Sequence, residues 1–250
     1  MEGPSLFLAQ QRLKPFKGQT IKAAVGNTKA IEPGSLKGLA ICDIFAWGKH
    51  LVFQFDTFAI RIHFMLFGTY EAEVEKEWVT GDYRRAREPR LAFTFSNGQI
   101  NMYSCSVKIL ETKNAKKEYD FSIDTMSKKW DPARAYKSVR AKPDEQIADV
   151  LLDQEIFAGV GNIIKNEVLS RMKIAPQHKV GDLSPAKIKA IVKDAQVYSH
   201  LFYKWRKAFE LRKHYQIYQK GVCPYCGGKV TRAKTGRRER WSYWCPIDQK

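Results

Sequence analysis

The first half of the chain consists of short segments in which apolar residues alternate or run together, each broken by turn-forming residues. This pattern is typical of strands and too short for most helices. The dipeptide Asn97-Gly98 favours a tight hairpin, because both residue types accept the positive φ angles of its turn. Residues 4–13 indicate a preceding helix. We therefore expect residues 1–121 to form a β-sandwich with a flanking helix. The expected strands are 39–45, 50–55, 58–64, 68–74, 91–95 and 99–104.

The composition changes near residue 121. Residues 122–142 are polar and basic and contain Pro132, which predicts a connection between two domains. Beyond it, apolar residues recur at helical spacing in three stretches. These stretches are 143–152, about 162–172 and 184–205. The predicted fold class is α+β with two domains, the second containing a helical part over 143–215 and a β-hairpin over 216–250.

The C-terminal hairpin carries a metal-like pattern of cysteines. Cys223 and Cys226 are separated by two residues, and Cys245 follows after a basic run. Two such pairs across a hairpin close a tetrahedral zinc site, and Asp248 stands where a fourth cysteine is expected. We expect one Zn²⁺ held by Cys223, Cys226, Cys245 and Asp248. The alternative is a hairpin stabilised by aromatic packing, with the cysteines simply reduced.

The charge of the chain points to a polyanionic partner. The formal net charge is +17, which favours nucleic acid or an anionic membrane surface. No apolar run is long enough to span a bilayer, and the first residues do not form a signal sequence. We therefore expect a soluble intracellular protein that binds nucleic acid and no membrane.

A glycine-rich turn precedes one of the expected helices. Gly159-Val160-Gly161-Asn162 allows close backbone approach, and Asn162 is expected to cap the helix whose N-terminus would face phosphate. Residues 151–154, this turn and Asn166-Glu167 together resemble the helix-two-turn-helix of the formamidopyrimidine-DNA glycosylase and endonuclease VIII family. The cysteine hairpin resembles that family's zinc finger.

The resemblance extends to the start of the chain. Glu2-Gly3-Pro4 matches the opening of family members, which begin with a catalytic proline. Met1 occupies the position of that proline. Gly48-Lys49-His50-Leu51 is similar to the family's strand with its lysine, residues 63–68 are similar to its void-filling loop, and Arg240 matches its finger arginine.

The resemblance assigns a role to each matched residue. It implies a glycosylase with lyase activity that flips a damaged base out of double-stranded DNA, with Met1, Glu2 and Lys49 as catalytic residues. The N-terminal amine would form a Schiff base with the sugar, and Glu2 would transfer protons. The family pattern also implies that Lys49, Asn162 and Arg240 bind phosphates, while Met65, Leu66 and Phe67 fill the void.

Several alternatives stay open at this point. Met1 could react through its primary amine, could slow the reaction through its side chain, or could replace a proline of the natural protein. Leu66 with Met65 and Phe67 resembles the loop of the endonuclease VIII branch, which implies oxidised pyrimidines as substrates, with oxidised purines as the alternative. A non-catalytic protein that binds damaged DNA, or an RNA-binding protein, would share the charge and the finger. The resemblance implies that the protein acts as a monomer.

Overall fold

The computed structural model describes residues 1–79 and 87–250, which are arranged in two compact units. The first unit contains Met1 and Ser5–Asp120, and the second contains Glu2–Pro4 and Phe121–Lys250. The first three residues after Met1 therefore belong with the C-terminal half of the chain. No helix in the described part of the chain is long and apolar enough to cross a membrane.

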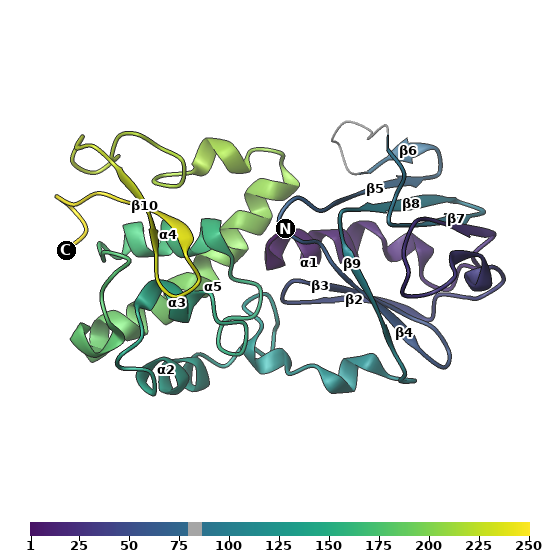
Figure 1. Cartoon of the computed structure of the whole chain (residues 1–250), viewed down its shortest axis with the longest axis horizontal. Coiled ribbons are helices and arrows are strands. Elements are labelled where there is room, and N and C mark those ends of the chain that lie inside the picture. The colour runs from purple at the N-terminus through teal and green to yellow at the C-terminus, as the bar shows by residue number, and fades with distance from the viewer. Residues whose placement is uncertain (80–86) are drawn as a thin grey trace. The chain divides into compact units, whose positions relative to one another are not determined.

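The first unit is a sandwich of two antiparallel sheets (Figure 1). Apolar residues of both sheets form one core, and Phe53 of one sheet meets Phe93 of the other edge to face at 5.4 Å between ring centres. Helix α1 (Gly3–Arg12) adds Leu6 and Ala9 to this core. One sheet has the order β1 (Ala23–Val25), β7 (Leu91–Phe95), β8 (Gly98–Tyr103), β5 (Thr69–Val74) and β6 (Glu77–Trp78). The other has the order β2 (Asp43–Trp47), β3 (His50–Gln54), β4 (Ala59–His63) and β9 (Ser106–Leu110).

The predicted sandwich is confirmed, but some strand limits differ. The strand expected from residue 39 begins at Asp43, because residues 39–41 hydrogen-bond instead to the segment around Gln19. Three strands, β1, β6 and β9, were not predicted. They are short or mixed in polarity and lie at sheet edges, where one side of the backbone needs no partner and apolar alternation is weak.

The expected hairpin between β7 and β8 is present, with a turn that differs in detail. Phe95 pairs with Gly98, so the loop consists of Ser96 and Asn97. Only Gly98 of this turn has a positive φ, at +147°. A Cβ atom at Gly98 would lie 1.9 Å from the carbonyl oxygen of Glu73 in β5. Glycine is therefore needed here for close approach of a neighbouring strand as well as for its backbone angle.

The second unit is helical, with a small sheet at its end (Figure 1). Its helices are α2 (Pro132–Arg140), α3 (Ile147–Leu151), α4 (Asn162–Arg171) and α5 (Pro185–Lys207). They share one apolar core, and the strands β10 (Thr231–Thr235) and β11 (Arg240–Trp244) form a hairpin with a separate small core. The described residues also form short 3-10 helices at Lys14–Phe16, Pro33–Leu36, Ala115–Glu118, Phe121–Ile123, Val180–Asp182 and Leu211–His214.

The segment 122–142, predicted to be a connection, contains helix α2. Asp131 caps this helix by accepting hydrogen bonds from the backbone of Ala133 and Arg134. Ala135 and Val139 are buried in the helical core. The apolar face of helix α2 is narrow, and its basic residues make the apolar pattern difficult to recognise in the sequence. The helix expected from residue 143 begins later, at Ile147, because Gln146 is extended and bridges to Lys179.

We expect Gly98→Ala to destabilise the first unit strongly. The added methyl group would collide with the backbone of β5, and overpacking of this kind costs about 1–3 kcal/mol in addition to backbone strain. Gly18→Ala is the matched control, since Gly18 also has a positive φ but nothing lies within 4 Å of the added atom. Urea unfolding should show Gly98→Ala to be less stable than Gly18→Ala by about 2 kcal/mol. Equal losses would contradict the steric argument.

Candidate functional site

Residue 2 is bound at the N-terminus of helix α4. Its carboxylate accepts hydrogen bonds from the backbone N–H groups of Ile163 at 2.7 Å and Ile164 at 3.2 Å. A Cβ atom at Gly161 would lie within 2.6 Å of the Glu2 side chain, so a glycine there leaves room for the carboxylate. The free N–H groups of a helix start favour negative charge. Glu2 is thus held in one place by two backbone N–H groups at the start of helix α4.

The prediction that Asn162 caps helix α4 was wrong. The N-cap position is Gly161, which has no side chain, and Glu2 supplies the acceptor from a distant part of the sequence. The amide of Asn162 instead donates to the main-chain carbonyl of Trp241 at 2.9 Å. Asn162 therefore links the helix start to strand β11.

Helix α4 holds the hairpin through buried polar side chains. Lys165 is fully buried, and its ammonium donates to Ser242 Oγ at 2.7 Å and to the Trp241 carbonyl at 3.3 Å. Asn166 donates to the same carbonyl and accepts from the Tyr243 N–H at 2.8 Å. The Trp241 carbonyl thus accepts hydrogen bonds from three side chains of one helix, which fixes β11 against it.

Glu167 fixes the chain that leads into the hairpin. Its carboxylate accepts backbone N–H groups from residues 216–218, at 2.8 to 3.1 Å. Burial raises the pKa of Glu167, and the three N–H groups act in the opposite direction. A buried carboxylate with this many donors is satisfied in its hydrogen bonding, so the segment before the finger has a defined position.

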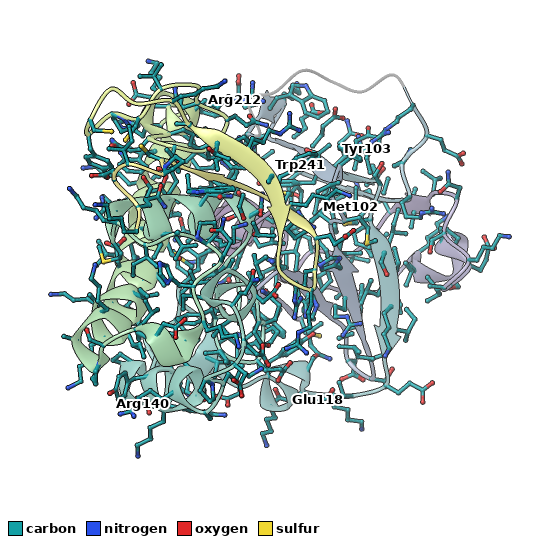
Figure 2. The ribbon with its side chains drawn as sticks, turned by 60° about the vertical axis from the view of Figure 1, so that its left-hand side comes forward. Met102, Tyr103, Glu118, Arg140, Arg212 and Trp241 are labelled. Carbon is teal, nitrogen blue, oxygen red and sulfur yellow. The ribbon has the colours of Figure 1, made fainter. Side chains whose placement is uncertain are left out.

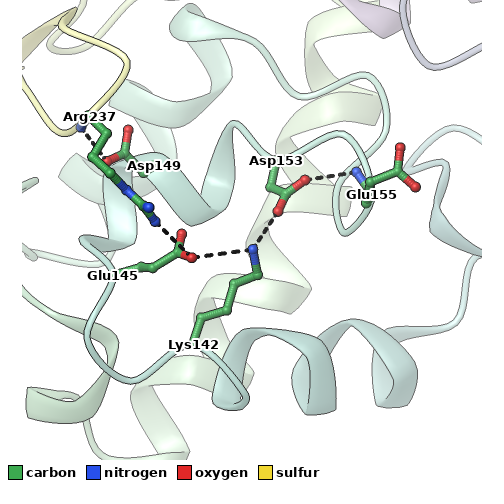
Figure 3. Close-up of polar contacts among 6 residues, drawn as sticks. All are labelled: Lys142, Glu145, Asp149, Asp153, Glu155 and Arg237. Atoms are coloured by element: carbon green, nitrogen blue, oxygen red, sulfur yellow. Dashed lines mark hydrogen bonds and ion pairs between the residues drawn. The ribbon is translucent and has the colours of Figure 1, made fainter.

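The turn of the hairpin is bound by acidic residues near helix α3, as Figure 3 shows. Asp149 accepts from the N–H of Arg237 at 2.7 Å, and Glu145 pairs with the Arg237 guanidinium at 2.9 Å. Lys142 pairs with Asp153 at 2.8 Å, so the network of ion pairs extends to the segment that follows helix α3. These contacts position the exposed Arg240 at the start of β11.

In the first unit, the terminal amine lies beside two of the predicted motifs. The Met1 amine donates to the carbonyls of Phe64 at 3.2 Å and Met65 at 3.4 Å. The pKa of His63 is lowered by burial and then by the positive charges of the Met1 amine, Lys49 and Arg61. Met1, Lys49 and His63 are therefore electrostatic neighbours, and His63 stays uncharged near neutral pH.

The predicted void-filling residues form an exposed apolar loop after β4. Met65, Leu66 and Phe67 are 55%, 65% and 78% exposed. This exposure excludes an ordinary buried strand at residues 65–67. Three adjacent large apolar side chains on the surface are unusual in a folded domain.

The three finger cysteines come together as predicted. The sulfur atoms of Cys223, Cys226 and Cys245 all lie within 4.8 Å of one another, and the Gly228 N–H donates to Cys226 Sγ at 3.4 Å. Asp248 does not belong to this group: its Oδ1 pairs with Lys173 at 3.0 Å. Its Oδ2 is buried and has no hydrogen-bond partner among the described residues. The cluster can hold a metal ion through three sulfurs, and the unpaired Asp248 oxygen is the kind of donor that would complete the set.

Sequence reasoning gave no role to several residues that organise the site. Lys165 and Asp149 fall in this group, and their partners lie far away in the sequence. A run of polar residues, Lys165-Asn166-Glu167, within an otherwise apolar helix was the available signal, because such residues are buried only with partners.

Known proteins share this fold and these sequence features. Residues 121–198 match the sequence model of the formamidopyrimidine-DNA glycosylase H2TH domain. The Lactococcus lactis formamidopyrimidine-DNA glycosylase, in a complex with DNA containing an abasic site, superposes with a TM-score of 0.84 at 22% identity, covering 100% of both chains. The fold is thus that of a two-unit DNA glycosylase with a helix-two-turn-helix domain.

Relatives in sequence carry endonuclease 8 names. Endonuclease 8-like 3 of Mus musculus is 34% identical over 206 residues, which is 81% of this chain and 33% of that protein. The DNA-(apurinic or apyrimidinic site) lyase Nei2 of Mycolicibacterium smegmatis is 24% identical and matches over 99% of this chain and 98% of its own length. Residues 121–198 form a domain of the formamidopyrimidine-DNA glycosylase H2TH family, and most of the chain is similar in sequence to endonuclease 8 proteins. The chain spans about a third of the mouse relative.

Burial of Lys165 makes the stability of the second unit depend on pH. Burial, with Arg240 nearby, lowers the pKa of Lys165 to about 7, although Asp149 and Glu2 act in the opposite direction. In the unfolded chain the pKa of lysine is about 10.4. Between these two values the unfolded state binds more protons than the folded state, so the free energy of unfolding rises with pH, by at most about 1.4 kcal/mol per pH unit.

We expect Lys165→Met to remove this dependence. Urea unfolding at pH 7, 8 and 9 should give a smaller increase in stability for the variant than for the unmodified protein. Lys193→Met, at an exposed position of helix α5, is the control and should keep the increase. An unchanged pH slope in Lys165→Met would show that Lys165 stays charged in the folded protein.

Proposed function

We propose that the protein is a base excision repair enzyme, a DNA glycosylase with lyase activity at abasic sites. The names of its relatives, endonuclease 8-like 3 and the lyase Nei2, support this function. The observation that carries it is the pair formed by consecutive residues 1 and 2. One presents a primary amine beside Lys49 and His63, and the other presents a carboxylate fixed on a helix N-terminus.

These two groups suit a Schiff-base reaction. In a polypeptide that begins at Met1, the lone pair of the amine attacks C1′ of the sugar, and the bond from C1′ to the base breaks. The base leaves with a proton, the sugar ring opens, and nitrogen and C1′ form the Schiff base. Loss of a proton from C2′ then expels the 3′ phosphate and breaks the strand. Glu2 is the proposed proton carrier, since its carboxylate directly follows the amine in the chain and is fixed by two N–H donors.

The remaining predicted residues are proposed to hold the DNA. Lys49, Asn162 and the exposed Arg240 can donate to phosphates, which positions a duplex without reading its sequence. Met65, Leu66 and Phe67 are exposed and apolar, as side chains that enter a base stack must be. Leu66 with its two neighbours favours oxidised pyrimidines over oxidised purines as substrates.

The finger is proposed to bind one Zn²⁺. Cys223, Cys226 and Cys245 would supply three sulfurs, and Asp248 would supply Oδ2, which is buried and unpaired among the described residues. When bound, the ion would cross-link the two ends of the hairpin and stabilise its fold. The chain's own hydrogen bonds from helix α4 would then set the orientation of β11.

The central test of the function is capture of the covalent intermediate. A duplex with one abasic site, incubated with the protein and borohydride, should yield a DNA adduct on Met1, identified by peptide mass spectrometry. Glu2→Gln should slow strand cleavage at least about a hundredfold, the usual effect of losing a general acid or base. Glu155→Gln, at an exposed position of the same unit, should cleave normally.

Other outcomes of this test point to the alternatives. Tight binding of the abasic duplex without any adduct would indicate a non-catalytic protein that recognises damaged DNA. An adduct on a lysine would remove Met1 from the mechanism. Duplexes with thymine glycol or 8-oxoguanine then establish the base preference, for which we expect faster release of thymine glycol.

Elemental analysis should find about one zinc per chain. Cys245→Ser removes a sulfur ligand and should lose the metal, and Asp248→Ala should weaken zinc binding at least about tenfold against a chelator. Asp144→Ala is the control, because the Asp144 side chain is 93% exposed and far from the cysteines in sequence. Full zinc affinity in Asp248→Ala would exclude this carboxylate as a ligand.

A further inference from the structure

The hairpin β10–β11 has one aromatic and basic face that the proposed function does not use. Arg232 pairs with Tyr243, and Lys234 pairs with Trp241 across the two strands. Paired residues of an antiparallel ladder, and residues two apart in a strand, lie on the same face of the sheet. Trp241 therefore shares a face with Arg232, Lys234 and Tyr243, and Figure 2 shows it on the hairpin.

The two faces of the hairpin have different surroundings. Ser242 lies on the opposite face, is fully buried, and bonds to Lys165 and Thr235. On the Trp241 face, Tyr243 is covered by Tyr218, whose ring lies 5.2 Å away. Trp241 itself is 41% exposed, and Arg232 and Lys234 are exposed beside it. The open part of this face thus consists of one indole ring and two positive charges.

The indole ring of Trp241 is in contact with the positively charged side chain of Arg232. The Arg232 guanidinium lies 4.0 Å from the centre of the Trp241 ring, which is the geometry of a cation–π contact. Among the residues that the structure describes, Lys234 forms one ion pair, with the exposed Glu239 at 3.7 Å. Such a pair contributes little to stability, so the lysine can bind a phosphate instead.

The contacts that hold strand β11 on helix α4 do not require a tryptophan at position 241. The contacts that fix residue 241 run through its main-chain carbonyl to Asn162, Lys165 and Asn166. These contacts do not depend on the side chain. A large apolar ring next to positive charges is, however, what an unpaired base needs, since bases stack on aromatic rings while lysine and arginine bind the backbone.

We propose that Trp241, Arg232 and Lys234 form a binding site for an unpaired nucleotide of single-stranded DNA. This inference rests on the proposed function in that it places a second DNA contact on the same polypeptide. A base in an intact duplex is paired and stacked, so its faces cannot reach the indole ring. The site therefore favours single-stranded or locally opened DNA over closed duplex.

The test compares the unmodified protein with two substitutions at position 241. Binding of a fluorescently labelled oligothymidylate is measured by anisotropy for the unmodified protein, Trp241→Phe and Trp241→Leu. Stacking predicts that Trp241→Leu binds about tenfold more weakly and that Trp241→Phe, which keeps an aromatic ring, loses much less. Both variants keep the main-chain carbonyl. Phe209→Ala, at another exposed aromatic residue of the same unit (58% exposed), should bind as the unmodified protein does.

The same proteins are then tested on an undamaged, fully paired duplex. The proposal expects little change in duplex binding by Trp241→Leu. Equal losses on single strand and duplex, or equal binding of oligothymidylate by Trp241→Leu and the unmodified protein, would overturn it. Cleavage of the abasic duplex by the unmodified protein is measured separately. Absence of cleavage together with loss of oligothymidylate binding in Trp241→Leu refutes the enzyme and supports the stacking site.

Discussion

The second unit depends on polar side chains buried along helix α4. A buried charge or amide is tolerated only when its hydrogen bonds are made, and each of these side chains finds partners on another segment. Glu167 holds the chain before the finger, Lys165 and Asn166 hold strand β11, and the free N–H groups at the helix start hold Glu2. One helix thereby sets the positions of residues that are far apart in the sequence.

This arrangement makes the proposed site sensitive to changes that do not touch it. Removing one partner of a buried hydrogen-bonded charge leaves the other unsatisfied, which costs more than the bond itself contributes. Asp149 illustrates the point, since its carboxylate binds the hairpin turn while Arg240 begins the strand that follows. A substitution within the helical core can therefore displace Arg240, a proposed DNA contact at the surface.

The sequence predicts the architecture better than the site. The periods of apolar residues predicted the sandwich and the helical unit, and the spacing of the cysteines predicted the hairpin, because all three are local patterns in the sequence. The missed strands β1 and β6 are too short to show a period. Helix α2 was missed because its apolar face is narrow. The cap of helix α4 could not be predicted at all, since Glu2 lies about 160 positions away from its partners Ile163 and Ile164.

The resemblance to a known family supplied the candidate residues, and the structure supplied their neighbours. In the structure, the Met1 amine and Lys49 both lie close enough to His63 to lower its pKa, and residues 65–67 are exposed. The carboxylate of Asp248 forms an ion pair with Lys173. This contact depends on how the chain packs, so the spacing of residues in the sequence could not predict it.

Because residue 241 is anchored through its main-chain carbonyl, the position of its backbone does not depend on its side chain. Every amino acid carries this oxygen, so the side chain can be exchanged while strand β11 keeps its place on helix α4. Residue 241 is thus a point at which evolution, or a protein engineer, can alter what the hairpin touches without rebuilding the scaffold beneath it.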